Sequence, residues 1–206
     1  VTAEPPPEEQ HVYRSEAVQA VCELLSAPSN TLQYLELSTV GLCGVDGADM
    51  PLLGCSYTSE AIGLLCAALG SEHCRLHTLK LNNSRMRPAE ASKLAAAIKG
   101  RAARPGGAGW QTVVLEASQL PVPQLLGLRE LPGGQHKRLC TNCSKLEAAE
   151  VKFIAELLAT NPLLEALELN GSLIGDGTRW LAAAIGKGAM PLVTLQLAEN
   201  AISVAQ

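Results

Sequence analysis

Cysteine, histidine and carboxylate side chains are the groups in this chain whose chemistry could bind a metal ion or transfer a proton. Among seven cysteines and four histidines, only Cys140-Thr141-Asn142-Cys143 forms a C-x-x-C pair, and His73, Cys74 and His77 form a separate group. A structural zinc ion needs four convergent ligands. One isolated pair does not supply them, and we expect no metal and no cofactor.

The carboxylates and histidines form no pattern typical of catalysis. The pairs Glu147 with Glu150 and Glu165 with Glu168 fit exposed faces of a helix and a strand, and the four histidines share no spacing. The chain contains no G-x-x-x-x-G-K-[ST] phosphate loop, no H-E-x-x-H metal motif and no G-x-S-x-G nucleophile turn. We therefore predict that it is not an enzyme.

The elements that must position these residues follow a repeated pattern, which is apolar at positions one, four, six and eleven. Six frames carry it: Leu32, Leu35, Leu37, Leu42; Leu76, Leu79, Leu81, Met86; Trp110, Val113, Leu115, Leu120; His136, Leu139, Thr141, Leu146; Leu164, Leu167, Leu169, Ile174; and Leu192, Leu195, Leu197, Ile202. Self-similarity on this scale predicts an array of equivalent structural units. The fourth frame matches least well, so its register is the least certain part of the pattern.

The spacing of the frames defines the unit. They start 44, 34, 26, 28 and 28 residues apart, which indicates a unit of 28 residues with insertions in the first two intervals. Such a unit holds a short strand, a turn and a helix of about three turns. Side chains alternate along a strand, so positions four and six face the core and positions three, five and seven face outward.

The helical half of the unit repeats as well. Ser15-Glu16-Ala17-Val18 aligns with Ser59-Glu60-Ala61-Ile62, with Cys22 and Cys66 at matching core positions. Leu94–Ile98 matches Leu181–Ile185, while Phe153, Ile154, Leu157 and Leu158 form the equivalent stripe between them. Their spacing is helical, and Ser15 or Ser59 is a candidate helix cap.

With these residues, the chain resembles the ribonuclease-inhibitor-like leucine-rich repeats over about residues 15–206. The resemblance implies an α/β solenoid, a right-handed horseshoe with a parallel sheet on the concave face and helices on the convex face. In that family, Asn or Cys at position nine bonds the backbone of the turn. Here this column reads Val40, Ser84, Ser118, Ser144, Ser172 and Asn200. Serine makes the same bond more weakly, which suggests a divergent member.

The boundaries follow from turn-forming residues. We expect residues 1–14, rich in proline and glutamate, to be a tail or linker, and residues 15–206 to be one domain of about six repeats. Surface loops are predicted near 43–57 and 100–109, and Pro121 to Gly134 is expected to lack a full helix. Since the last frame is not followed by a helix, we expect further chain or a partner to cover the C-terminal repeat edge.

Charge and composition restrict the partners. The formal net charge of −4 and a pI of about 5.6 argue against nucleic-acid binding, and no apolar run is long enough for membrane insertion. An odd number of irregularly spaced cysteines does not form a secreted disulfide framework. We expect an intracellular protein, cytoplasmic or cytoskeletal, with an organellar location also open.

The outward positions of the strands form the predicted partner-binding face. They mix both charge signs with small polar groups, which suits a protein or peptide partner. The candidate residues are Tyr34, Glu36, Lys80, Asn82, Glu116, Arg138, Glu168, Asn170 and Gln196. Tyr34 and Arg138 are of types enriched at binding hot spots. The alternative is that a loop, the convex side or a terminus binds the partner.

Three functions remain open. The first is a non-catalytic scaffold or assembly subunit that binds protein partners in a larger intracellular complex, cytoskeletal, ciliary or organellar. The second is the ligand-sensing part of an innate-immune-type receptor. The third, a regulator resembling the Ran GTPase-activating protein, is the least favoured, because that family has a longer array and an acidic tail that are not seen here.

Overall fold

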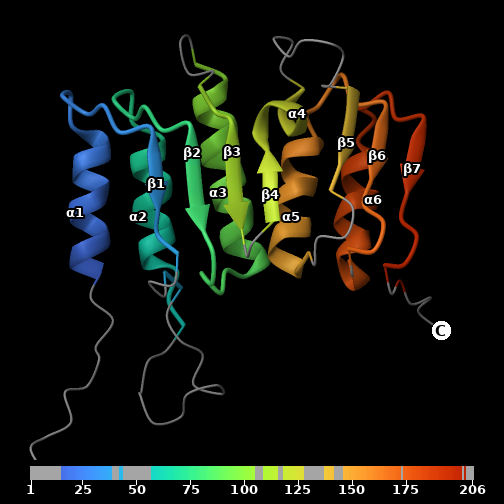
Figure 1. Cartoon of the computed structure of the whole chain (residues 1–206), viewed down its shortest axis with the longest axis horizontal. Helices are drawn as coiled ribbons and strands as arrows, with labels where there is room; N and C mark the ends of the chain where they lie inside the picture. The colour runs from blue at the N-terminus through green and yellow to red at the C-terminus, as the bar shows by residue number, and fades with distance from the viewer. Residues whose placement is uncertain are drawn as a thin grey trace, which may run out of the picture.

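The fold is mixed α/β, as predicted, with a row of strands in front of a row of helices (Figure 1). The computed structural model describes residues 15–38, 42–43, 57–104, 109–115, 118–127, 137–141, 146–172, 174–200 and 202. Along most of this range a short strand is followed by a helix and then by the next strand. Of the helices in this range, none has both the length and the apolar composition to cross a bilayer.

The strands form two sheets. The first has the order β1-β2-β3-β4 and the second the order β5-β6-β7. Their bounds are β1 Tyr34–Glu36, β2 Thr78–Leu81, β3 Thr112–Leu115, β4 Ser118–Pro121, β5 Arg138–Cys140, β6 Ala166–Glu168 and β7 Thr194–Gln196. All pairs are parallel except β3 with β4. Parallel neighbours require a crossover, which the helices supply.

The helices pack side by side behind the strands (Figure 1). Their bounds are α1 Ser15–Ser26, α2 Glu60–Leu69, α3 Pro88–Ala102, α4 Val122–Leu126, α5 Ala148–Leu158 and α6 Thr178–Gly186, with a 3₁₀ turn, η2, at Gly175–Gly177. The contacts run α1 to α2, α2 to α3, α3 to α5 and α5 to α6. The helix row is therefore continuous where the strands divide into two sheets.

The strand pairing confirms the register of the repeat frames. Position four of one frame lies opposite position four of the next, as with Leu35 and Leu79, Leu79 and Val113, and Leu139 and Leu167. This settles the doubtful fourth frame, because Leu139 is fully buried at the predicted place. The helix stripe of Phe153, Ile154, Leu157 and Leu158 is also fully buried, so the core lies between the two layers.

Strand β4 departs from the repeat. Leu120 was expected after a turn, but it lies on a strand that returns antiparallel to β3, opposite Val113. Two residues separate the strands in sequence, a length that suits an antiparallel hairpin and not a crossover. Leu120 is still fully buried. The helix after it, α4, has five residues, in agreement with the expected lack of a full helix.

Two further expectations are corrected by the structure. The insertion predicted at 100–109 begins inside α3, which continues to Ala102; near this end of the helix, the Arg101 guanidinium lies 4.8 Å from the centroid of the Trp110 ring. Leu195, predicted to be buried, is 45% exposed, because β7 is the last strand of its sheet in the described part of the chain. Most of the insertion predicted at 43–57 and the tail at 1–14 lie outside the described residues.

Candidate functional site on the outward strand face

The predicted partner-binding residues come from two groups of strands. Tyr34, Glu36 and Lys80 lie on β1 and β2, while Arg138, Glu168 and Gln196 lie on β5 to β7. Asn82 and Asn170 follow the ends of β2 and β6, and Glu116 lies outside the described residues. Between the two groups, Val114 on β3 is only 5% exposed although its position predicts an outward side chain. The candidate residues that the structure describes thus fall into two polar clusters, one on each sheet.

The first cluster joins β1 to β2. The Tyr34 hydroxyl donates to Glu36 Oε2 at 2.5 Å, and Lys80 Nζ lies 3.8 Å from the same oxygen and 5.2 Å from the centroid of the Tyr34 ring. The Tyr34 hydrogen bond, with smaller contributions from Ser38 and Lys80, lowers the pKa of Glu36 below its ordinary value. The three side chains hold one another in place, and Tyr34 remains 47% exposed.

The second cluster joins β5 to β6. Arg138 Nη2 donates to Glu168 Oε2 at 2.8 Å and lies 2.7 Å from Oε1. The Arg138 side chain is 65% exposed while that of Glu168 is 7% exposed. This hydrogen bond and the carboxylate charge raise the pKa of Arg138. Glu168 was predicted to be an exposed contact residue, but it is buried and acts as the anchor that orients Arg138.

Hydrogen bonds between outward polar residues continue beyond the ends of β2 and β6. Asn170 Nδ2 donates to Gln196 Oε1 at 3.0 Å, and Asn170 Oδ1 accepts from Ala198 N at 2.9 Å. In the first sheet, Asn82 N donates to Ser38 Oγ at 3.3 Å. Candidate residues of neighbouring units are therefore bonded to each other in pairs.

Two residues of the position-nine column, Ser172 and Asn200, bond main-chain groups of neighbouring segments, whereas Ser118 of the same column lies on β4. Asn200 Oδ1 accepts from Ser172 N at 2.8 Å, and Asn200 Nδ2 donates to Leu169 O at 2.6 Å. The Ser172 hydroxyl donates to Thr141 O at 3.3 Å. Both side chains are almost fully buried, so each satisfies the main chain of a neighbouring turn. Val40 and Ser144 of the same column lie outside the described residues.

Two buried asparagines were missed by the sequence analysis. Asn161 Nδ2 donates to Gln124 O and Leu125 O, while its Oδ1 accepts from the amides of Leu163 and Leu164. Asn30 bonds Leu25 O, His73 O and Leu32 N in the same manner. Both precede a strand frame, at Leu164 and Leu32. An asparagine two or three residues before a frame was the signal that could have found them.

The helix starts differ from expectation. Ser59 is at the cap position of α2 but makes no side-chain capping bond, and Thr58 Oγ1 accepts from Glu60 N instead. Glu147 and Glu150, expected on an exposed face, form a capping box at the start of α5, with Glu150 fully buried. Their chemistry is therefore structural, because they bond main-chain amides of the first helical turn.

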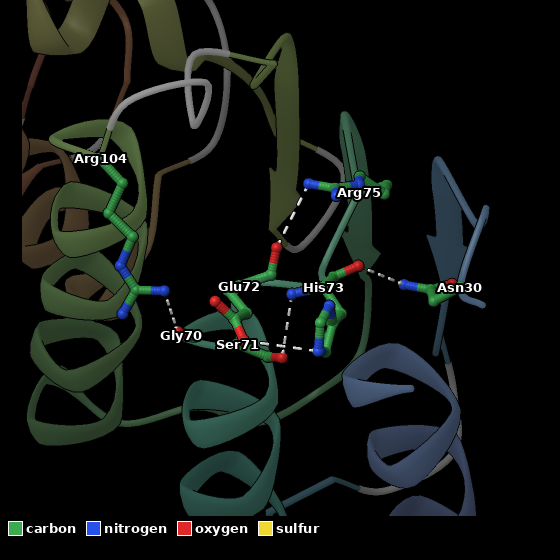
Figure 2. Close-up of polar contacts among 7 residues, drawn as sticks. All are labelled: Asn30, Gly70, Ser71, Glu72, His73, Arg75 and Arg104. Atoms are coloured by element: carbon green, nitrogen blue, oxygen red, sulfur yellow. Dashed lines mark hydrogen bonds and ion pairs between the residues drawn. The ribbon is translucent and has the colours of Figure 1, made fainter. Parts of the chain in front are cut away.

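The histidine group at residues 73–77 lies in the turn between α2 and β2 (Figure 2). His73 Nε2 is 3.5 Å from Glu72 Oε1, and the His73 amide donates to Ser71 Oγ at 3.2 Å. Asn30 Nδ2 donates to His73 O, while Arg75 Nη1 donates to Glu72 O at 3.2 Å (Figure 2). These bonds close the turn.

No three metal-binding side chains converge anywhere in the described part of the chain. His77 packs instead against Gly109, where a Cβ atom would lie 2.7 Å from His77 Cδ2. Cys22 is buried, as its repeat position predicts, and Cys66 is partly buried. Burial raises the pKa of Cys66 to about 11, so its thiol stays protonated at neutral pH.

No protein-family model matches the chain, and no curated protein is significantly similar to it.

Proposed function

We propose that this chain is a non-catalytic leucine-rich-repeat solenoid that serves as a protein-binding scaffold in an intracellular complex. In this proposal the strands line one curved surface, the helices the other, and protein partners bind the outward strand face. The observation that carries it is the shared register: equivalent frame residues lie opposite one another on parallel strands. Stacked equivalent units present their outward residues as columns that a partner can span.

The arrangement of the polar clusters supports a rigid binding surface. Tyr34 and Arg138 keep exposed side chains, yet each is held by a carboxylate on its own or a neighbouring strand. A side chain that is already ordered loses less conformational entropy when it binds. Tyrosine and arginine also contribute most often to binding energy at protein interfaces.

The test is quantitative capture of partners by the tagged full chain from cells that express it. We compare the wild type with Tyr34→Ala and with the double variant Arg138→Ala/Glu168→Gln. The second substitution in the double variant neutralises the carboxylate that Arg138 would otherwise leave buried and unpaired. We expect either variant to reduce capture of the wild-type partners at least fivefold.

The control is Gln19→Ala, which removes an exposed side chain on α1 that bonds only to nearby Glu23 among the described residues. It should capture the same partners as the wild type. Equal capture by all variants would reject the strand face as the binding site. The failure of the wild type to enrich any protein over a tag-only sample would reject the scaffold function itself.

Exposed apolar side chains on and near β7 support the expectation that further chain or a partner covers the C-terminal repeat edge. Val193 is 85% exposed, Leu195 is 45% exposed and Ile202 is 45% exposed. A cover over this edge remains a prediction, and it is separate from the capture test because none of the test substitutions lies there.

A further inference from the structure

A groove between α5 and α6 lies on the helix side of the molecule, away from the outward strand face. Four alanines are among its lining residues: Ala155, Ala159 and Ala184, which are buried, and Ala183, which is exposed. Trp180 forms one wall, and Lys152, Glu156 and Lys187 supply the charged groups. We call it the α5–α6 groove. Figure 1 shows the two helices side by side at the C-terminal half of the helix row.

The size of the groove limits what it can hold. Its volume is about 50 Å³, whereas sites for cofactors and drug-sized ligands occupy about 300–1,000 Å³. The space therefore suits the end of one aliphatic or aromatic side chain, and the surrounding alanines and Trp180 are apolar partners for it.

The charges around the groove are predominantly positive. Lys152 Nζ lies 2.9 Å from Glu156 Oε1 and 5.8 Å from the centroid of the Trp180 ring, and the Arg179 guanidinium lies 4.7 Å from that centroid. Lys99 of α3 also approaches Glu156, at 3.8 Å. Within the described ranges, no carboxylate pairs with Arg179 or Lys187. One acidic side chain thus stands among four basic ones.

From this geometry we infer that the α5–α6 groove docks an acidic segment of a protein partner, with one apolar side chain of that segment seated against Trp180. The carboxylates of the segment pair with Lys152, Lys187 and Arg179. A phosphate polymer or an anionic lipid surface fits less well, because those ligands have no single apolar side chain to insert beside Trp180 and the alanines of the groove. This inference rests on the proposed scaffold function and gives the chemistry of one of its partners.

The test starts from a displayed library of random 12-residue peptides selected on the intact chain. Counter-selection uses the support without the protein, so that the double variant Lys152→Glu/Lys187→Glu is kept for the binding measurements. We expect the recovered peptides to share several Asp or Glu residues around one apolar residue. Their dissociation constants are then measured by Trp180 fluorescence in a Trp110→Phe background, where Trp180 is the only remaining tryptophan.

The charge-reversal variant should weaken binding of the recovered peptides at least tenfold. The matched control is Arg75→Glu/Arg104→Glu, which changes the net charge equally at the turn shown in Figure 2. It should retain the wild-type affinity, and circular dichroism verifies that both double variants are folded. Equal weakening by the control would show that binding depends only on net charge, and it would overturn the inference.

Two other outcomes also overturn it. One is the absence of acidic residues from the recovered peptides. The other is tighter binding of phosphatidylserine vesicles or duplex DNA than of any peptide at the same ionic strength. Tyr34→Ala should not affect the peptides, since Tyr34 lies on the strand face. If peptide binding is unaffected by Lys152→Glu/Lys187→Glu while partner capture still depends on Tyr34, the groove is rejected and the scaffold function stands.

Discussion

Buried amide side chains connect neighbouring units of this molecule. Asn30, Asn161 and Asn200 are each at most 6% exposed, and each bonds main-chain groups from at least two segments. A buried amide left without partners costs about 1–3 kcal/mol, so these residues stabilise the stacking only while every bond is made. Asn200 can be predicted from the sequence because it lies in a repeat column, whereas Asn30 and Asn161 lie before the frames, where the repeat pattern makes no prediction.

Gly127 packs directly against the Asn161 side chain. Its φ of +66° is in the left-handed region, and a Cβ atom there would lie 2.3 Å from Asn161 Oδ1. We expect Gly127→Ala to lower the free energy of unfolding by about 3 kcal/mol or more, as the sum of left-handed strain and overpacking against a side chain that cannot move without losing its bonds. Urea denaturation measures this change.

Gly188 offers a matched control. Its φ is +71°, but nothing lies within 4 Å of a Cβ atom built on it. Gly188→Ala should therefore cost only the backbone strain, about 1–2 kcal/mol. Equal losses for the two substitutions would show that the approach to Asn161 does not contribute.

At the scale of the elements, periodicity predicts parallel strands and helices well, because each unit repeats the same burial pattern. It does not predict β4, since Leu120 satisfies the apolar pattern equally well on a returning strand. Nor does it predict that Glu168 is buried beneath Arg138, because side-chain alternation gives the face but not the depth. The pairing of Glu36 with Lys80 follows from the columns, as both occupy position five on adjacent strands.

The contacts of Glu36 with Tyr34 on β1 and with Lys80 on β2 can be tested by measuring the pKa of Glu36. The Tyr34 hydrogen bond is the largest cause of its lowered pKa. We therefore expect Tyr34→Phe to raise the pKa of Glu36 toward its ordinary value near 4.5. Lys80→Met, which removes a smaller contribution, should raise it less. Carbon-13 NMR of the Glu36 carboxyl group measures both changes.

The pH dependence has a definite sign. A carboxyl group whose pKa is lowered by folding contributes stability above its unfolded pKa, and this contribution is lost as the pH falls through the folded pKa. The Glu36 contribution is therefore present at neutral pH and disappears under acid conditions. An unchanged Glu36 pKa in Tyr34→Phe would contradict the hydrogen bond as its cause.

The whole molecule combines a divided strand layer with a continuous helix layer. Strands β1 to β4 and β5 to β7 belong to separate sheets, but α3 packs on α5 across this division. Ser92 Oγ donates to Glu156 Oε1 at 3.3 Å and Lys99 Nζ to Glu156 O at 3.0 Å, both from α3 to α5. These contacts join the helices behind the first sheet to those behind the second.

Two tryptophans report on the two halves. Trp110 is buried immediately before β3, and Trp180 lies on α6. In the single-tryptophan variants Trp180→Phe and Trp110→Phe, we expect urea unfolding curves with coincident midpoints, because the α3–α5 contact makes the array one cooperative unit. Each substitution can itself change the stability of the protein. Unfolding of each variant is therefore also followed by far-ultraviolet circular dichroism, and its fluorescence midpoint is compared with that curve. Separate midpoints would show that the halves unfold independently.

Glu156 is shared between helices that belong to different halves. An occupant of the α5–α6 groove that draws Lys152 outward would leave this carboxylate to Lys99 and to the Ser92 hydroxyl, both of which belong to α3. Glu156 would then be bound only by α3, which packs against α5 across the division between the two sheets.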